Sequence, residues 1–193
     1  MTTISAALKN WEAKEEGRVA VEAVKLELYC QTPPIAKLDS SINSCVECEH
    51  LALSTNCIDR LIPLPGLTKL KILSVGRNHI KKIEHLDAVA GSLEQLWLSY
   101  NQISALDNLS GLSNLTTLYV SNNNIKNWAE LDKIADLPNL AEILLVGNPI
   151  YDEFTKEMAR VEVLKHLPNL TKIDGDMVKP SEREMAAGGG VEE

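Results

Sequence analysis

The chain has 193 residues, a length that suits one domain with a single core better than two full domains. Hydrophobic residues make up 45% and charged residues 24% of the chain, which excludes a disordered, collagen-like or disulfide-scaffold protein. The excess of 27 acidic over 19 basic residues gives a net charge of −8, and this charge argues against nucleic acid or an anionic membrane as a partner of the whole molecule.

Residues 1–23 predict a helical cap. Ile4, Leu8 and Trp11 have the i, i+4, i+7 spacing of an amphipathic helix. The segment has no basic region followed by an apolar stretch of the kind found in a secretory leader, and no run of 18 apolar residues occurs in the sequence. We therefore expect a soluble protein of the cytoplasm with no membrane span.

Residues 24–150 contain an internal repeat. The pattern consists of two apolar residues separated by one residue, an Asn three positions after the second of them and an apolar residue two positions after the Asn. It recurs five times, after a degenerate first copy at Leu26-x-Leu28, and the spacing of its asparagines is typical of leucine-rich repeats. The sequence thus predicts an α/β solenoid of about six repeats, with a curved parallel sheet on its concave face. The five asparagines are Asn56, Asn78, Asn101, Asn123 and Asn148.

We expect each of these asparagines to end a strand with its amide turned inward. There the amide can satisfy backbone groups of the bend that no sheet ladder reaches. Stacked copies would form a polar ladder inside an apolar interior. An aliphatic residue at these positions would leave the same backbone groups unpaired.

The segments after the third full repeat predict helices. The fourth repeat is longer than the third, and Leu131, Ile134 and Leu137 on its return path predict an α-helix. Residues 151–176 predict a second cap made of a helix and a last half-strand at 170–175. Its expected apolar stripe consists of Phe154, Met158, Val161 and Leu164.

Residues 177–193 predict a polar tail. Ser181-x-x-Glu184 has the pattern of a capping box that starts a short helix, and Gly188 and the two glycines after it would end that helix. We expect the final residues to be disordered.

The cysteines raise the question of a zinc site, because Cys45-x-x-Cys48 is followed by His50 and Cys57. The sequence lacks the second C-x-x-C pair that many zinc sites have. The favoured interpretation is that these three cysteines and Cys30 are small buried side chains kept reduced. We therefore predict no metal and no cofactor.

No catalytic constellation is apparent. The four histidines fall in unrelated coils, and the sequence contains no nucleophile elbow, phosphate-binding loop, dinucleotide fingerprint or zinc-protease motif. The sequence predicts a binding protein and not an enzyme.

The repeat register predicts which side chains line the concave sheet. The outward residues between the strand leucines include Trp97, Tyr119 and Leu144 on adjacent strands, with Ile72 and Val146 nearby. Strands ~4.8 Å apart would place the first three in an apolar ridge roughly 10 Å long. Isolated apolar surface residues are common, but aromatic residues are only 4% of this chain, so a contiguous set predicts a partner site.

Charge is unevenly distributed along the chain. Between Arg60 and Ile83 there are six basic residues and no acidic one. A solvated face is one interpretation, and a strip that orients an acidic partner is the other. The candidate strip consists of Arg60, Lys69, Lys71, Arg77, Lys81 and Lys82.

From about residue 4 to residue 175, the chain resembles the leucine-rich-repeat light chains of axonemal outer-arm dynein. The resemblance is carried by residues 33–39 (PPIAKLD), 50–56 (HLALSTN), 72–78 (ILSVGRN), 93–101 (LEQLWLSYN), 119–123 (YVSNN) and 167–175 (LPNLTKIDG). It implies a non-catalytic subunit that binds the microtubule-binding domain of a dynein heavy chain and modulates motility. It also implies a location in the cytoskeleton, in the axoneme of cilia or flagella.

The resemblance implies that the hydrophobic sheet face is the heavy-chain site. Tubulin is a second candidate partner, and we expect the isolated light chain to be a monomer. The final residues depart from the basic ending associated with this family, which leaves the role of the tail open. Alternatives are a repeat adaptor, such as a phosphatase regulatory subunit, and a ribonucleoprotein assembly factor. The candidate heavy-chain site consists of Trp97, Tyr119, Leu144, Ile72, Val146, Ser99, Tyr100, His50 and Asn122.

Overall fold

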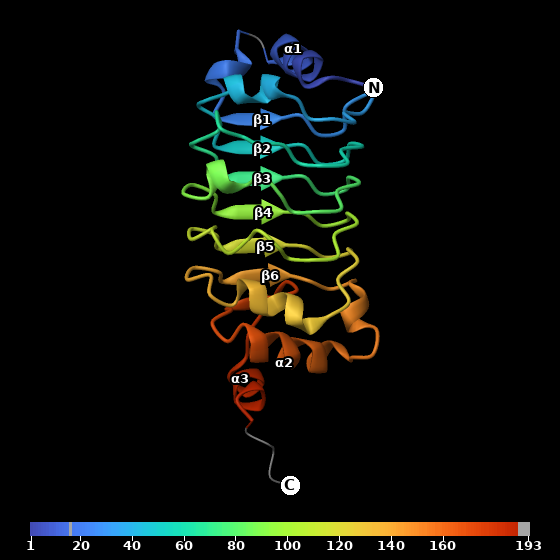
Figure 1. Cartoon of the computed structure of the whole chain (residues 1–193), viewed down its shortest axis with the longest axis vertical. Helices are drawn as coiled ribbons and strands as arrows, with labels where there is room; N and C mark the ends of the chain where they lie inside the picture. The colour runs from blue at the N-terminus through green and yellow to red at the C-terminus, as the bar shows by residue number, and fades with distance from the viewer. Residues whose placement is uncertain (16, 189–193) are drawn as a thin grey trace.

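The computed structural model describes residues 1–15 and 17–188 and shows a stack of coils along one long axis (Figure 1). Successive coils contribute adjacent strands to one sheet, whose strand order follows the chain order. All neighbouring pairs up to β7 are parallel, and β8 closes the sheet as an antiparallel partner of β7. The strands are β1 (Lys25–Glu27), β2 (His50–Ala52), β3 (Ile72–Ser74), β4 (Gln95–Trp97), β5 (Thr117–Tyr119), β6 (Glu142–Leu144), β7 (Lys172–Ile173) and β8 (Asp176–Met177). The predicted leucine-rich-repeat solenoid is confirmed.

Each strand begins one residue earlier than the leucine pattern suggests. In the second coil, Leu51 is the middle residue of β2 and Leu53 follows the strand, yet both side chains are buried. The inward leucines therefore flank the end of the strand, while the residues on either side of Leu51 face the concave surface. The sheet therefore consists of many closely spaced coils, each of which contributes a strand of only two or three residues.

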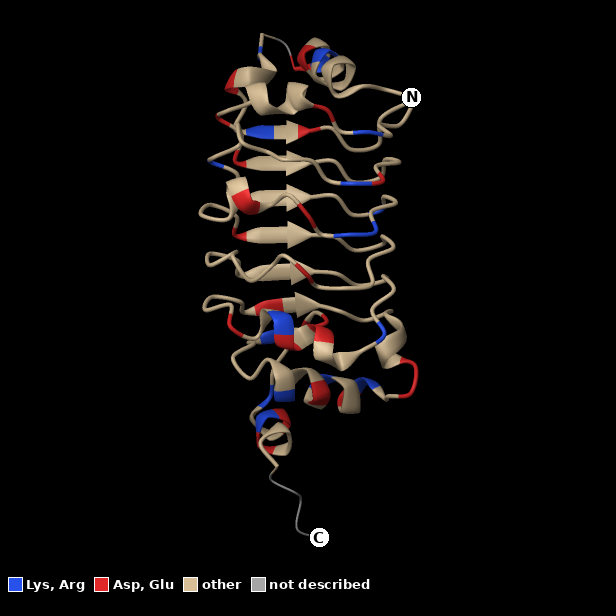
Figure 2. Cartoon of the chain, viewed as in Figure 1, with Lys and Arg blue, Asp and Glu red and all other residues tan. Residues whose placement is uncertain are grey.

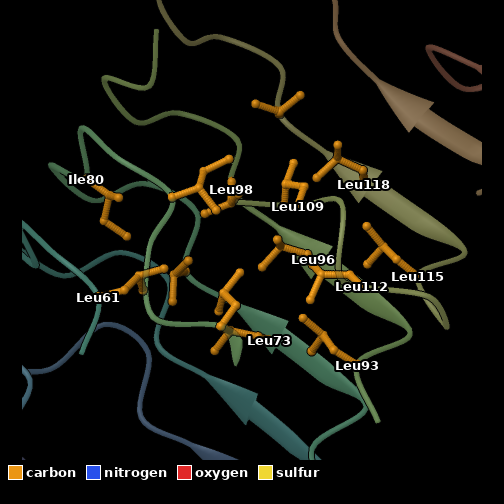
Figure 3. Packing of buried hydrophobic residues seen from close by; sticks show 14 of the residues in the cluster. Leu61, Leu73, Ile80, Leu93, Leu96, Leu98, Leu109, Leu112, Leu115 and Leu118 are labelled. Carbon is orange, nitrogen blue, oxygen red and sulfur yellow. The ribbon is translucent and has the colours of Figure 1, made fainter. Parts of the chain in front are cut away.

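Aliphatic side chains fill the space between the sheet and the return path of each coil. Figure 3 shows Leu73, Leu96 and Leu118, which come from adjacent strands, beside Leu109 and Leu112 from the return path. All five are essentially inaccessible to solvent. Full burial of a leucine stabilises a fold by about 1.5 to 3 kcal/mol, so this repeated layer is the main source of stability.

The asparagines form the expected ladder between coils. Asn78 Oδ1 accepts a hydrogen bond from the Ile58 N–H at 2.9 Å. Its Nδ2 donates to Leu53 O at 3.1 Å and to Val75 O at 3.0 Å. The other four asparagines make equivalent bonds, and all five are buried. Each amide thus joins its own coil to the preceding one.

The residue before each ladder asparagine has a left-handed backbone, which the sequence did not predict. Its φ is 54° at Arg77 and 61° at Tyr100, for example, and 79° at Gly147. A left-handed conformation costs a residue with a Cβ roughly 1 to 2 kcal/mol, which the burial around it offsets. At Gly147 an added Cβ would also lie 2.6 Å from Asn122 Oδ1, so this turn requires glycine.

Helix α1 (Ile4–Lys14) covers the first coil at one end of the stack (Figure 1). Thr3 caps it, since its hydroxyl accepts a hydrogen bond from the Ala6 N–H at 3.2 Å. The predicted residues Ile4, Leu8 and Trp11 are all buried. The boundaries after residues 23, 150 and 176 stay predictions.

Short 3₁₀ helices lie before β1 and on several of the connections between strands. They are η1 (Ala20–Glu22), η2 (Ser40–Ser44), η3 (Asp87–Val89), η4 (Trp128–Ile134) and η5 (Pro149–Tyr151). None of the helices in the described part of the chain has the length and apolar composition of a membrane span.

The prediction of an α-helix in the fourth repeat is wrong, because this segment is the 3₁₀ helix η4. Leu131, Ile134 and Leu137 are buried as expected. Leu131 and Ile134 lie one turn apart in η4, because a 3₁₀ helix has 3.0 residues per turn, and Leu137 lies three residues beyond Ile134, outside the helix.

The predicted stripe of the second cap, helix α2 (Lys156–His166), is confirmed only at Leu164. Ala159, Val163 and Leu164 are buried, whereas Met158 is 55% exposed. The predicted stripe was counted from Phe154, but the helix begins only after Thr155, so Phe154 lies outside its periodicity. The Phe154 ring instead packs against the ring of Trp128, with the ring centroids 5.2 Å apart.

Arg160 fastens the C-terminal segment to α2. Its guanidinium is buried and donates hydrogen bonds to the Ile173 and Met177 carbonyls and to the Glu182 carboxylate. Glu182 lies in α3 (Pro180–Ala186), where it also accepts a hydrogen bond from the Lys179 N–H at 2.7 Å. The buried charge is therefore paired.

The predicted short tail helix exists, but its capping residues are not the predicted ones. The carboxylate that caps α3 belongs to Glu182 and not to Glu184, because the helix starts at Pro180 and not after Ser181. The predicted disorder of the last residues concerns 189–193, which lie outside the described residues.

Candidate functional site

The strand register places the predicted ridge residues side by side on the concave face. Trp97 pairs with Tyr119, and Tyr119 pairs with Leu144 on the next strand. The rings of Trp97 and Tyr119 stack with centroids 5.8 Å apart and an angle of 22° between their planes. All three side chains are half-buried, so the ridge is rigid but accessible.

A second row of side chains runs beside the ridge. His50 and Ile72 pair with each other on β2 and β3, and both are half-buried. The His50 ring meets the Trp97 ring edge-on, with a centroid distance of 6.1 Å and an angle of 71°. His50, Trp97 and Tyr119 therefore form one continuous aromatic cluster across β2, β4 and β5.

The remaining predicted residues lie at the end of the strands toward the turn. Ser121 Oγ donates a hydrogen bond to Ser99 Oγ at 2.9 Å, and Val146 is 44% exposed. Tyr100 and Asn122 occupy left-handed turn positions, and are on the rim of the face and not at its centre.

A carboxylate and an ammonium group form the polar end of the ridge. Tyr119 Oη donates a hydrogen bond to Glu142 Oε1 at 2.8 Å, and Lys172 Nζ lies 3.0 Å from the same oxygen. Burial and the neighbouring Glu142 raise the pKa of Tyr119 to about 12, so its hydroxyl stays protonated. Sequence analysis missed Lys172 because its strand is only a two-residue remnant of the repeat.

Two polar atoms of the aromatic cluster lack a hydrogen-bond partner among the described residues. They are His50 Nε2 and Trp97 Nε1, and both are buried. Buried polar groups in proteins are nearly always hydrogen-bonded, which makes this pair unusual. Both atoms lie inside the cluster and are not part of the surface that a partner would contact.

His50 is held neutral by its surroundings. Burial lowers the pKa of its imidazole, and the Lys25 charge lowers it further, while Glu27 acts in the opposite direction. A neutral ring suits an aromatic cluster that a partner would cover, because a covered charge costs more than a covered neutral ring.

Acidification should therefore destabilise the protein through His50. The folded pKa lies below the ordinary value of 6.5, so the unfolded chain binds more protons below that pH. The contribution of neutral His50 is fully present above pH 6.5 and declines as the pH falls toward the folded pKa. Urea unfolding of the wild type and of His50→Gln between pH 7.5 and 5.5 checks this. The wild type should lose stability more steeply, and parallel curves would contradict the assignment.

The structure places the six residues of the predicted basic strip in three different surroundings. Lys69 pairs with Glu47 at 2.6 Å and Lys71 pairs with Glu49 at 2.7 Å, both just before the strands. The Arg77 guanidinium lies 4.1 Å from the centre of the Tyr100 ring, just after the strand. Only Arg60, Lys81 and Lys82 remain together, on the edge beyond the asparagine ladder.

The cysteines do not form a cluster of metal-ligand type. Cys45 and Cys48 are buried, and burial raises the pKa of the Cys48 thiol to about 12. A thiol in this state is a poor metal ligand, since the thiolate is the ligating form. No group of three His, Cys, Asp or Glu side chains suited to a metal occurs within residues 1–15 and 17–188. Cys57 is half-buried, and the prediction of burial is wrong for Cys30, which is exposed because it occupies a left-handed turn position.

The fold and this face define a leucine-rich-repeat protein with an aromatic cluster on its concave face. Residues 92–133 match the family model described as leucine rich repeats (2 copies). An internalin of Listeria monocytogenes has the same fold, with a TM-score of 0.60 and 21% identity over 95% of this chain and 60% of that one.

Closer similarity comes from two relatives described as dynein axonemal light chain 1. The protein of Chlamydomonas reinhardtii is 52% identical over 96% of this chain and 95% of its own length. The protein of Xenopus laevis is 54% identical over 95% of each chain. The chain belongs to the axonemal dynein light chain 1 family, and it is thus a non-catalytic light chain. This membership decides against the phosphatase-adaptor and ribonucleoprotein interpretations.

Proposed function

We propose that this light chain binds the microtubule-binding domain of an outer-arm dynein heavy chain through its concave face. It thereby modulates ciliary or flagellar motility from within the axoneme. The observation that carries the proposal is the stacked Trp97–Tyr119 pair, which presents a contiguous, half-buried aromatic surface on the concave face.

The geometry of the ridge has the properties of an interface anchor. Trp and Tyr are enriched among the residues that dominate binding energy, particularly where they are contiguous and preorganised. Here the stacking of the rings and the hydrogen bond from Tyr119 to Glu142 hold the side chains in place before binding. Little side-chain entropy would then be lost on association.

Family membership supports axonemal dynein as the assembly in which the protein acts. The particular domain of the heavy chain is part of the proposal and rests on the resemblance of the concave-face segments. The long-range electrostatics point the same way, since a chain of net charge −8 gains no attraction from the acidic surface of tubulin. Tubulin is thus a secondary partner, reached once the heavy chain holds the light chain beside the lattice.

Co-sedimentation with microtubules at near-physiological salt tests the proposal. The isolated light chain should remain largely in the supernatant, and it should pellet when the purified heavy-chain microtubule-binding domain is added. Tight pelleting of the light chain alone would contradict this order of binding. Failure of the light chain to bind the heavy-chain domain in a direct assay would contradict the proposal itself.

A further inference from the structure

The edge of the solenoid beyond the asparagine ladder carries a row of cations. Figure 2 shows Lys and Arg segments recurring along the side of the coils toward which the strand arrows point. Backbone hydrogen bonds of 2.8 Å hold these coils in register. They run from Cys57 to Ile35, from His79 to Ile58 and from Gln102 to Ile80.

The register places three cations at equivalent positions. Lys37, Arg60 and Lys82 each lie two residues after the isoleucine that accepts the backbone bond, so they stack on consecutive coils. Lys126 occupies the same edge two coils beyond Lys82. At ~4.8 Å per coil, the row is about 19 Å long.

A hollow of about 640 Å³ lies at one end of this row. Lys81, Lys82 and Lys126 line it, and none of the three pairs with a carboxylate within residues 1–15 and 17–188. The carboxylate at the hollow, Glu130, already accepts hydrogen bonds from Lys133 at 2.7 Å and from the Leu106 N–H at 2.8 Å. The hollow therefore keeps an excess of positive charge.

The polar groups between the lysines suit a peptide. Gln102, Ser104 and Asn124 line the hollow and are exposed, and their side chains make no hydrogen bond to the described residues. Amide side chains both donate and accept hydrogen bonds, so they can pair with the N–H and C=O groups of an extended backbone.

A nucleic acid fits this edge less well. Single-stranded nucleic acids are typically held by aromatic side chains on which bases stack, and the hollow is lined by Lys, Gln, Ser, Asn and Glu. The length of the row also exceeds that of a single phosphate group.

We propose that this edge binds an extended acidic peptide segment of about six residues, which the cation row spans at ~3.3 Å per residue. Carboxylates of the peptide pair with Lys81, Lys82 and Lys126 at the hollow and with Arg60 and Lys37 further along the row, and its backbone contacts the amides of the hollow. None of these residues belongs to strands β1–β6, so the edge and the concave face can be occupied together. The proposal is independent of the heavy-chain site.

Fluorescence anisotropy with a labelled hexaglutamate peptide tests the proposal, with hexaglutamine as the uncharged control peptide. The double variant Lys81→Glu/Lys126→Glu should weaken hexaglutamate binding at least tenfold. The matched control, Lys69→Glu/Lys71→Glu, changes the net charge equally but on the opposite edge, and should weaken binding less than threefold. All four lysines are exposed, and a thermal melt verifies that both variants fold.

Four outcomes would overturn the proposal. Absence of hexaglutamate binding to the wild type is the first. Equal weakening of hexaglutamate binding in the two double variants is the second, because it would show that binding depends on net charge and not on the position of the lysines. The third is equal or tighter binding of an oligothymidylate with the same number of charges, which would identify the edge as a nucleic-acid site. The fourth is displacement of hexaglutamate by inorganic triphosphate at the same charge concentration, because it would identify free phosphate and not a peptide as the ligand.

Discussion

Replacement of Asn123 by Leu is expected to lower the free energy of unfolding by about 3 kcal/mol. Asn123 Oδ1 accepts a hydrogen bond from the Ile103 N–H at 3.0 Å, and that N–H has no other partner among the described residues. Its Nδ2 donates to the Leu98 carbonyl at 3.1 Å and to the Val120 carbonyl at 3.0 Å. Leucine fills a similar volume but can make none of these bonds.

The cost should come mainly from the stranded N–H group. The Leu98 carbonyl keeps a hydrogen bond from Asn101, and the Val120 carbonyl keeps one from Asn148, so each loses only one of two donors. A buried donor with no partner costs about 1 to 3 kcal/mol, and each lost bond adds about 1 kcal/mol or less. The sum accounts for the expected loss.

Urea denaturation of the variant measures this loss, and the adjacent residue offers a matched control. Asn124 has an exposed side chain with no hydrogen bond to the described residues, so Asn124→Leu makes the same chemical change outside the ladder. It should alter stability by about 0.5 kcal/mol or less. Equal effects of the two substitutions would show that the ladder does not hold the coils together.

The ladder also affects the binding face. Asn101 and Asn123 each link the coil of their own strand to the preceding coil, and these coils carry Trp97 and Tyr119. Backbone hydrogen bonds from the Leu98 N–H to Tyr119 O and from the Tyr100 N–H to Ser121 O join the same two coils. The buried amides add a second connection, so both contribute to the distance at which the two rings stack.

The sequence was sufficient to predict the solenoid, because its repeat shows both the length of each coil and which side chains of the coil are buried. The strand leucines are buried because they alternate with outward residues, and the asparagines are buried because only an amide satisfies that bend. These features depend on contacts between adjacent coils, and each coil is nearly a copy of the next.

The terminal and irregular parts were harder to predict, because they are not copies of a repeat. The burial of Arg160 depends on carbonyls of β7 and β8 and on Glu182, which lie 13 to 22 residues away in the chain. The face that α2 buries depends on where Thr155 starts the helix, and apolar spacing alone gave the wrong start.

The candidate site shows the same limit. Register alone placed Trp97, Tyr119 and Leu144 on adjacent strands. The sequence could not show that Lys69 and Lys71 are paired with glutamates of the preceding coil, because this pairing depends on side-chain positions across coils. For this reason only Arg60, Lys81 and Lys82 of the six predicted cations remain on the edge beyond the asparagine ladder, where Lys37 and Lys126 join them.

Trp97→Ala is expected to weaken binding to the heavy-chain microtubule-binding domain by about 30-fold, or about 2 kcal/mol, if the proposed function holds. The substitution removes the centre of the cluster, which contacts both His50 and Tyr119. The side chain points out of the solenoid, so the fold should persist with a modest change in melting temperature. Isothermal titration calorimetry measures the affinity directly.

Two further substitutions separate loss of the anchor from loss of the fold. Val19 is 44% exposed just before η1, ahead of the first strand and not on the sheet, so Val19→Ala should change affinity less than threefold. Trp128 packs against Tyr151 and Phe154 near the opposite cap, so Trp128→Ala should lower stability more than Trp97→Ala does while affecting affinity less. A ridge that anchors the heavy chain requires that Trp97→Ala lose more affinity than Trp128→Ala, and that Trp128→Ala lose more stability than Trp97→Ala. Unchanged affinity in Trp97→Ala, or equal losses in all three variants, would place the heavy-chain site elsewhere on the solenoid.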